Sequence, residues 1–232
     1  MQPITTLIPG SKPIELIDYY DCFKDYYLEC ELETKSWFVR NIDKDWCIFD
    51  CGANIGYYSI LFSRFAPKGS IYAFEPTPSI KKLQTNLEHH KISNVTIINN
   101  ALSDKCGTFI DDVYQIWGEP PLQIPFNFIT IDSFVEEYGI SRLDCIKIDV
   151  DSYDFAVLRG AEKTIFKFNP YIMVELNHAL NVRNENIIQV LNWMHSKGYE
   201  TTEVYDSENF LFKKNLPHQN TASIAIYFPE GE

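Results

Sequence analysis

Basic residues are scarce in this 232-residue sequence, which has 20 lysines and arginines against 32 aspartates and glutamates and a formal net charge of −12. Proteins that bind nucleic acid use lysine and arginine to contact the phosphates. The few basic pairs, such as Lys81-Lys82 and Lys213-Lys214, are isolated from one another. We therefore expect no nucleic-acid partner.

Long apolar runs are also missing. No stretch approaches the roughly 20 apolar residues of a membrane-spanning helix, and the N-terminal segment lacks the basic start and apolar core of a signal peptide. The six cysteines form no C-x-x-C pair and no cluster with histidine, so we expect free thiols rather than disulfides or a zinc site. These absences predict a cytoplasmic protein with no membrane contact.

Short apolar runs alternate with helical patterns along the middle of the chain, which is typical of a parallel α/β sheet. The pattern predicts strands at 46–50, 70–75, 95–99, 144–149 and 171–175. It predicts helices at 54–65, 153–167 and 185–197. Two alternating segments near the end, 199–204 and 223–228, predict a pair of strands at one sheet edge and bring the total to seven.

Two regions fall outside this alternation. Residues 1–45 include a crowded aromatic and acidic stretch and a predicted helix at 34–41, and residues 106–132 predict a loop or hairpin between a strand and a helix. Each region either flanks the open side of a pocket or covers apolar surface, and the sequence leaves both alternatives open. We expect one domain over 1–232, with 1–45 as a cap segment and 46–232 as a Rossmann-like core.

Polar residues end five predicted strands in succession. They are Asp50, Glu75, Asn99-Asn100, Asp149 and Glu175. In an open parallel sheet, ligands bind at the carboxyl ends of the strands. One acid at a strand end is unremarkable, but five polar ends in a row predict a binding site.

The loop from Asp50 to Gly56 discriminates between ligands. A dinucleotide fingerprint requires G-x-G-x-x-G, but Asn54 stands in place of the second glycine and Asp50 would repel a pyrophosphate. A ligand with one carboxylate fits the free N–H groups at the helix start near Asn54 and Tyr57, and nearby acids favour an ammonium or sulfonium group. Glu75 is placed to accept both ribose hydroxyls. S-adenosylmethionine has all of these groups.

The sequence resembles the FkbM-type methyltransferases over roughly residues 31–175. The matching pieces are ELET at 31–34, FDCGANIGYY at 49–58, FEP at 74–76, NALSD at 100–104, TID at 130–132, IKIDV at 146–150, VLRGA at 157–161 and the strand at 170–175. The resemblance implies a Rossmann-like class I methyltransferase fold with helices on both faces of a seven-stranded, mostly parallel sheet that has one antiparallel edge strand. It also implies O-methylation, commonly of sugar hydroxyls, with S-adenosylmethionine as the methyl donor.

The resemblance further implies which positions contact the cofactor. These are Glu31, Asp50, Gly52, Ala53, Asn54, Gly56, Tyr57, Glu75, Pro76, Asn100, Ala101 and Asp149. The chain departs from the family at one point, because Asp151-Ser152 stands where Glu-Gly is usual. Aspartate keeps the charge with a shorter reach. Ser152 replaces a glycine suited to a turn with positive φ, at a modest cost in strain.

Methyl transfer from a sulfonium is an in-line displacement, so positioning the acceptor supplies much of the catalysis. A sugar hydroxyl also needs a base or a metal to take its proton. Asp149 and Asp151 are the first candidates for the base, and His178 is the second. A Mg²⁺ ion held by Asp149, Asp151, Glu175 and Asn177 is an alternative that we do not favour.

The favoured interpretation is an O-methyltransferase acting on a small-molecule or saccharide acceptor. One alternative is a methyltransferase that acts on a nitrogen or carboxylate of a peptide or metabolite. Another is a catalytically silent, cofactor-binding assembly module, against which the intact loop from Asp50 to Gly56 argues. The aromatic segment near the N-terminus is compatible with a homodimer. The acceptor, the methylated position and the pathway stay open.

Overall fold

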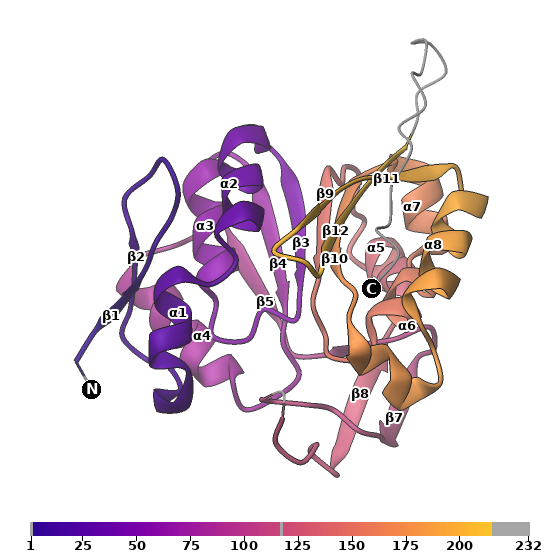
Figure 1. The fold of residues 1–232 in the computed structure, drawn as a ribbon, viewed down its shortest axis with the longest axis horizontal. Helices are drawn as coiled ribbons and strands as arrows, with labels where there is room; N and C mark the ends of the chain where they lie inside the picture. Colours follow the sequence, from indigo (N-terminus) through magenta and orange to yellow (C-terminus); the bar gives the residue numbers. More distant parts are fainter. Residues whose placement is uncertain (1, 117, 215–232) are drawn as a thin grey trace, which may run out of the picture.

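The computed structural model describes residues 2–116 and 118–214 of the chain. Its centre is a seven-stranded sheet with the order β11-β12-β10-β9-β3-β4-β5 (Figure 1). The strands are β3 (Cys47–Cys51), β4 (Ser70–Phe74), β5 (Val95–Ile98), β9 (Cys145–Ile148), β10 (Tyr171–Glu175), β11 (Tyr199–Tyr205) and β12 (Asn209–Lys214). Pairing is parallel from β5 to β10, whereas β12 runs antiparallel to both β10 and β11. The expected mostly parallel, seven-stranded sheet is confirmed, with its antiparallel strand one place in from the edge.

The edge of the sheet contains a strand, β12, that the sequence pattern did not predict. β11 matches the predicted strand at 199–204, but its partner is β12, whereas the predicted partner at 223–228 lies outside the described residues. Asp206 and Ser207, with φ of 49° and 69°, form the turn between the two strands. The run Asn-Phe-Leu-Phe-Lys-Lys of β12 lacks a regular alternation of apolar and polar residues, so the period-two pattern did not identify it.

Helices cover both faces of the sheet (Figure 1). On one face lie α2 (Leu32–Asn41), α3 (Tyr57–Phe65) and α4 (Ile80–His89), and on the other lie α5 (Ile131–Glu137), α6 (Asp154–Arg159), α7 (Glu162–Phe168) and α8 (Ile187–Ser196). Successive residues of a strand pack on opposite faces of the sheet because side chains alternate along a strand. In β3, for example, Ile48 packs in the core under α2, α3 and α4, and Phe49 packs in the core under α5 to α8.

The predicted helix at 153–167 is wrong as a single element, because α6 and α7 are separated at Gly160 and Ala161. The Gly160 carbonyl accepts a hydrogen bond from Asp132 N at 2.9 Å. This bond takes the place of the one that the carbonyl would accept within a continuous helix. The Asp132 carboxylate in turn accepts hydrogen bonds from the backbone N–H groups of Lys163 and Thr164, at 3.1 and 2.8 Å, and caps α7. The break therefore serves the packing of α5 against α7.

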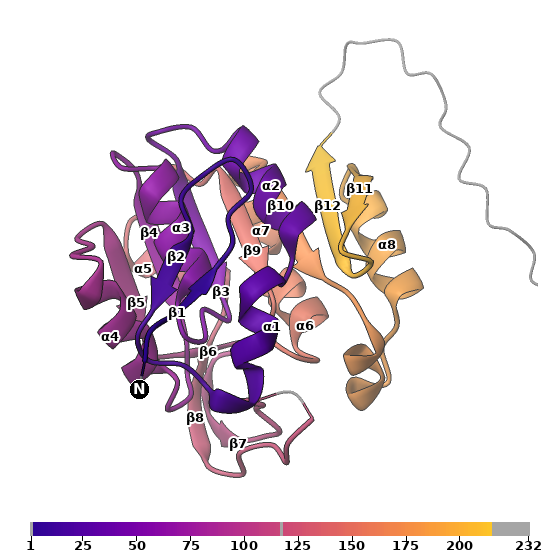
Figure 2. The same ribbon diagram turned by 60° about the vertical axis from the view of Figure 1, so that its left-hand side comes forward.

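The two regions outside the alternation are built from short elements (Figure 2). The N-terminal segment forms β1 (Ile4–Thr6), β2 (Ile14–Leu16), the 3₁₀ turn η1 (Asp21–Phe23) and α1 (Lys24–Glu29). The inserted segment contains β7 (Gly107–Ile110) and β8 (Pro125–Ile129), which pair antiparallel. The short strand β6 (Ala101–Leu102) pairs with β8 in parallel on the side away from β7. Of the loop and the hairpin that the sequence left open for 106–132, the described residues form the hairpin.

The cysteines and the helix lengths agree with the sequence pattern over the described residues. The six cysteines are all free, and Cys30, Cys47, Cys51 and Cys145 are buried. None of the helices in 2–116 and 118–214 combines the length and apolar character needed to cross a membrane. The predicted helix at 54–65 begins only at Tyr57, since Asn54 and Gly56 adopt positive φ in the preceding turn.

Candidate active site

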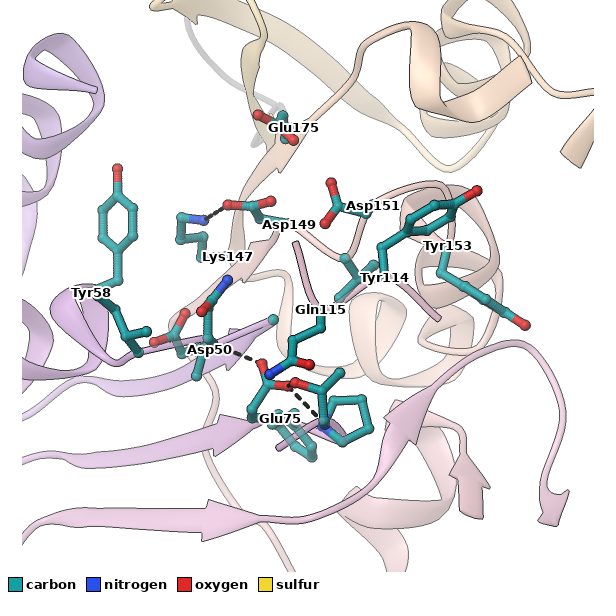
Figure 3. Close-up of a pocket in the computed structure, with 18 of the residues that line it drawn as sticks. Asp50, Tyr58, Glu75, Tyr114, Gln115, Lys147, Asp149, Asp151, Tyr153 and Glu175 are labelled. Carbon is teal, nitrogen blue, oxygen red and sulfur yellow. Dashed lines mark hydrogen bonds and ion pairs between the residues drawn. The ribbon is translucent and has the colours of Figure 1, made fainter. Parts of the chain in front are cut away.

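A cavity of about 360 Å³ opens where β3, β4, β9 and β10 end (Figure 3). Sites for small ligands are typically about 300–1,000 Å³ in volume. Both irregular segments contribute walls, with Tyr26 and Tyr27 from α1 and with Tyr114 and Gln115 from the insertion. Both alternatives hold for the N-terminal segment, because it flanks the pocket and also covers apolar surface through the fully buried Ile14 and Leu16.

Nearly all of the predicted site residues line this cavity. The predicted cofactor contacts found in the lining are Glu31, Asp50, Gly52, Ala53, Asn54, Tyr57, Glu75, Pro76, Asn100, Ala101 and Asp149. The candidate bases Asp151 and His178 line it as well. His178 is exposed and begins the 3₁₀ helix η2 (His178–Arg183), at the rim.

Gly56 is the predicted cofactor contact that does not line the cavity. It is the N-cap of α3 with φ of 94°, and a Cβ at this position would lie 2.5 Å from Leu83 Cδ1 on α4. The glycine is therefore explained by the turn and by the close packing of α3 on α4. The spacing of Gly52 and Gly56 suggested a ligand contact because a glycine at this position can serve either ligand binding or close helix packing.

The loop after β3 is pressed against the end of β9. Gly52 has φ of 86°, and a Cβ there would lie 1.8 Å from the Asp149 carbonyl oxygen, so only glycine fits. Two residues later Asn54, with φ of 47°, donates its backbone N–H to Glu75 Oε2 at 2.8 Å. The loop thereby ties together the ends of β3, β4 and β9.

Glu75 is held in one orientation by the chain around it. Its Oε1 accepts hydrogen bonds from Thr77 N at 2.8 Å and Thr77 Oγ1 at 2.5 Å, and its Oε2 accepts the bond from Asn54. Burial raises the pKa of Glu75, while these hydrogen bonds oppose the rise by favouring the ionised form. An ionised carboxylate has about four acceptor positions, so three intramolecular bonds leave room for a ligand donor.

Two buried oxygens beside Glu75 have no partner within the described residues. Asp50 is only 1% exposed, and its Oδ2 accepts a hydrogen bond from Ser59 Oγ at 2.5 Å, but its Oδ1 accepts none. Asn54 Oδ1 is unpaired in the same way. Burial raises the pKa of Asp50 to about 6. Buried acceptors are normally satisfied, so this pair fits a ligand that brings ammonium or hydroxyl donors, as S-adenosylmethionine does.

Lys147 is a site residue that sequence reasoning missed. It lines the cavity at 1% exposure, with Nζ 2.7 Å from Asp149 Oδ2 and 4.4 Å from the centre of the Tyr58 ring. Burial opposes its charge, but Asp149, Glu31 and Asp50 outweigh burial and raise the pKa of Lys147. A lysine within an otherwise apolar strand, two residues before an acid on the same face, was the available signal.

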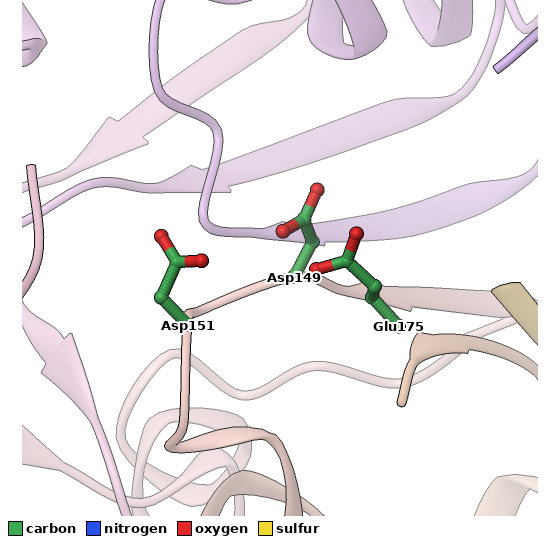
Figure 4. A group of neighbouring side chains, drawn as sticks. All are labelled: Asp149, Asp151 and Glu175. Carbon is green, nitrogen blue, oxygen red and sulfur yellow. The ribbon is translucent and has the colours of Figure 1, made fainter. Parts of the chain in front are cut away.

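Three carboxylates converge beyond the lysine. Ligand atoms of Asp149, Asp151 and Glu175 all lie within 4.8 Å of one another, and Figure 4 shows their carboxylates pointing to the same side. Burial, then Asp149, raises the pKa of Asp151 to about 8. Proximity to Asp149, then burial, raises the pKa of Glu175 to about 10. Like charges this close cannot all ionise without a compensating cation, so the group retains protons near neutral pH.

Such oxygens suit a hard divalent cation, but the suggested fourth ligand is engaged elsewhere. Asn177 Oδ1 accepts a hydrogen bond from Ala179 N at 2.8 Å and caps η2, while its Nδ2 donates to Glu208 Oε2 at 3.0 Å. Among the acidic side chains, Asp149, Asp151 and Glu175 converge, and Asn177 lines the same cavity. A Mg²⁺ ion held by these four residues stays an alternative that we do not favour.

The turn that carries Asp151 is strained, as the loss of the usual glycine predicts. Asp151 and Ser152 have φ of 45° and 80°, in the region that favours glycine. Ser152 is fully buried, and its Oγ accepts a hydrogen bond from Arg183 Nε at 3.3 Å. The Arg183 guanidinium also lies 3.4 Å from the centre of the Tyr153 ring. These contacts from η2 hold the turn in place.

The sheet order with its inserted antiparallel strand, and the cavity at the strand ends, are those of a class I methyltransferase. The fold is shared with an FkbM methyltransferase from Methylobacillus flagellatus KT, at a TM-score of 0.57 and 16% identity over 77% of this chain and 46% of that one. SMU.1697c from Streptococcus mutans, solved with S-adenosylhomocysteine, superposes with a TM-score of 0.52 and 12% identity over 79% of this chain and 96% of that one.

The FkbM methyltransferase domain matches residues 50–201, and the chain belongs to this methyltransferase family. Methyltransferase sdnD of Sordaria araneosa is 22% identical over 71% of this chain and 77% of its own length. Hexuronic acid methyltransferase AglP of Haloferax volcanii is 22% identical over 63% of this chain and 62% of its own length. The 31-O-demethyl-FK506 methyltransferase FkbM of Streptomyces tacrolimicus is 25% identical over 50% of this chain and 59% of its own length.

Proposed function

We propose that this protein uses S-adenosylmethionine to methylate a hydroxyl group of a sugar or of a glycosylated molecule. The observation that carries the proposal is the single cavity that joins the unpaired acceptors of Asp50 and Asn54, beside Glu75, to the carboxylates of Asp149 and Asp151. The names of two relatives, a hexuronic acid methyltransferase and a 31-O-demethyl-FK506 methyltransferase, support an oxygen acceptor.

The cofactor's groups match the polar groups of the β3–β4 side. The remaining acceptor capacity of Glu75 suits the ribose hydroxyls, and the unpaired oxygen of Asp50 suits the ammonium group. The first N–H groups of α3, which begins at Tyr57 directly after the loop, suit the carboxylate. When bound, the cofactor supplies an electrophilic methyl group, and binding, orientation and proton removal fall to the chain.

Asp151 is the base that we favour for the acceptor hydroxyl. With a pKa of about 8 its ionised form is a stronger base than an ordinary carboxylate, and the ionised fraction grows as the pH rises toward 8. Asp149 has one oxygen occupied by Lys147 at 2.7 Å, so its role is to orient the acceptor and to balance the lysine charge. His178, exposed at the rim, remains the second candidate.

Transfer of a labelled methyl group from S-adenosylmethionine to a panel of glycosides tests this function. We expect a product that survives mild alkali, because a methyl ether resists the hydrolysis that destroys a methyl ester. An alkali-labile product would assign a carboxylate acceptor instead, and an N-methyl product would assign a nitrogen. Binding of S-adenosylhomocysteine without transfer to any class of acceptor would favour a silent cofactor-binding module.

A further inference from the structure

A second hollow adjoins the main cavity and has a different character. We call it the acidic chamber, and it is defined by the five carboxylates that line it: Glu29, Glu31, Glu175, Asp206 and Glu208. Glu31, Glu175 and Glu208 line the main cavity as well, so the two spaces share a wall. The chamber lies between the end of α1, the start of α2 and the β10–β12 side of the sheet.

Asn209 gives the chamber an unsatisfied acceptor. It lies directly across from Glu175 in the β10–β12 ladder, so both side chains project from the same face. Its Nδ2 donates to Glu31 Oε1 at 3.2 Å, which fixes the amide orientation. Its Oδ1 has no partner within the described residues, although Asn209 is only 2% exposed and lines the chamber. A buried acceptor of this kind is suited to a ligand donor.

Negative charge exceeds positive charge around this space. No lysine, arginine or histidine occurs among its described lining residues. Lys147 and Lys35 act on Glu31 from nearby, but Lys147 is paired with Asp149, and Lys35 donates to Thr6 Oγ1 and Cys30 Sγ at 2.7 and 3.2 Å. Glu175 belongs to the crowded carboxylates that retain protons, but two buried and engaged ammonium groups still do not balance the remaining carboxylates of the chamber.

Some chamber oxygens are already used and others remain available. The Asp206 carboxylate caps α2 by accepting from Thr34 N at 2.9 Å and Thr34 Oγ1 at 2.7 Å. Glu208 uses Oε2 for Asn177, which leaves its Oε1. Within the described residues, no hydrogen bond reaches the carboxylate of Glu29 or that of Glu175. The available groups are thus acceptors on several sides of one space.

We infer that the acidic chamber binds an ammonium group of the acceptor, so that the acceptor is an amino-bearing molecule, with an amino sugar as the simplest form. The inference rests on the proposed function. An ammonium group has three donors and no acceptor, which matches Glu29, Glu208 and the Asn209 oxygen. The Tyr26 ring, 55% exposed and shared by both spaces, adds an aromatic face for a cation. A uronic acid would be repelled here.

The ammonium group serves recognition and is not the atom that receives the methyl group. Neighbouring carboxylates stabilise the protonated form of an amine, and a protonated amine has no lone pair to attack a methyl group. The chamber therefore selects the acceptor while a hydroxyl in the main cavity reacts. This division agrees with O-methylation and gives the carboxylates of the chamber a role apart from proton removal.

Saturation-transfer NMR with matched sugars tests the inference. The probes are methyl 2-, 3-, 4- and 6-amino-hexosides and their N-acetyl counterparts, measured on the full chain with and without S-adenosylhomocysteine. We expect at least one free amine to bind about ten-fold more tightly than its N-acetyl partner. The double variant Glu29→Gln/Glu208→Gln should remove that preference. The control Glu200→Gln/Glu203→Gln, which removes two exposed charges on β11, should keep it.

Each other outcome has a definite meaning. Equal binding of amine and N-acetyl partners throughout, or a preference that survives in the chamber variant, would overturn the inference. Weaker S-adenosylhomocysteine binding by the chamber variant, with no effect on amines, would also overturn it by assigning the chamber to the cofactor's own ammonium group. Failure of the wild type to bind S-adenosylhomocysteine would count against the proposed function alone, because the amine comparison can be made without it.

Discussion

The two sides of the cavity differ in how their charges are satisfied. On the β3–β4 side, Glu75 is held by three hydrogen bonds and Asp50 by one, so the chain fixes the groups that await a ligand. On the β9–β10 side, Asp149, Asp151 and Glu175 crowd within 4.8 Å. Lys147 contacts only one of these three carboxylates by hydrogen bonding. Figure 3 shows the two groups of side chains on either side of the cavity.

This difference separates binding from chemistry. Groups fixed by hydrogen bonds are preorganised and bind a constant ligand with little rearrangement. Burial raises the pKa of Asp50 only to about 6, whereas burial and crowding together raise those of Asp151 and Glu175 to about 8 and about 10. Strongly shifted values are characteristic of groups that move protons. We therefore assign the constant cofactor to the β3–β4 side, and the acceptor and its proton to the β9–β10 side.

The largest effect should come from removing the proposed base. Asp151→Asn should lower the rate of methyl transfer about 10²-fold or more while S-adenosylhomocysteine affinity stays unchanged, because Asp151 lies on the acceptor side. Single-turnover rates and calorimetry on the same protein check both halves of this expectation. A variant that transfers at the wild-type rate would remove Asp151 from the mechanism, and His178→Ala would then be the next variant to measure.

The next effect concerns stability. Lys147→Met removes one partner of a buried ion pair, and we expect a loss of about 3 kcal/mol in the free energy of unfolding near neutral pH. The loss should shrink at pH 5, where the neighbouring carboxylates bind protons instead. Urea unfolding measures it, with Arg142→Met as the control, since the half-exposed Arg142 forms its ion pairs with Asp45 and Asp144 at the surface, where such pairs contribute little to stability. Equal losses in both variants would contradict the account.

A smaller effect is the pH dependence caused by Asp154. Burial raises its pKa to about 7, above the roughly 3.9 of an unfolded aspartate. Its contribution to stability is therefore complete below about pH 4 and is lost as the pH rises through 7. Asp154→Asn keeps the acceptor for Val150 N and should reduce the fall in unfolding free energy between pH 5 and 8 by about 1 kcal/mol or more. Parallel profiles for variant and wild type would refute this.

Metal removal should have the smallest effect. Lys147 already places a positive charge on Asp149, and Asn177 is engaged in capping η2. We expect EDTA to change the methyl-transfer rate by less than about two-fold. If activity is lost with EDTA and restored by added Mg²⁺, the three carboxylates hold a metal ion. In that case the metal ion, rather than Asp151, assists removal of the proton.

The sequence predicted the features that depend only on neighbouring residues in the chain. Asp50, Glu75 and Asp149 each stand at the end of a predicted strand, so the α/β pattern predicted their place in one cavity. The positive φ at Ser152 followed from a missing glycine. These features need only a strand, a turn and the rule that ligands gather at one sheet edge.

What the sequence could not show depends on contacts between distant segments. Glu31 and Asn209, whose side chains meet in the chamber, are 178 positions apart. The break between α6 and α7 depends on Asp132, about thirty positions from the N–H groups it caps. The ion pair of Lys147 was missed because the strand pattern treats a buried lysine as an exception rather than as a site. Packing, which local patterns do not encode, decides all three.

The most direct test of the central claim is calorimetric titration of S-adenosylhomocysteine into wild type, Asp50→Asn and Asp154→Asn. Asp50→Asn keeps an acceptor for Ser59 but turns a donor toward the ligand, whereas Asp154 is buried nearby and does not line the cavity. We expect saturable binding by wild type and Asp154→Asn, and binding weaker by about ten-fold or more, or about 1.4 kcal/mol, for Asp50→Asn. No binding by folded wild type, or equal binding by all three proteins, would contradict it.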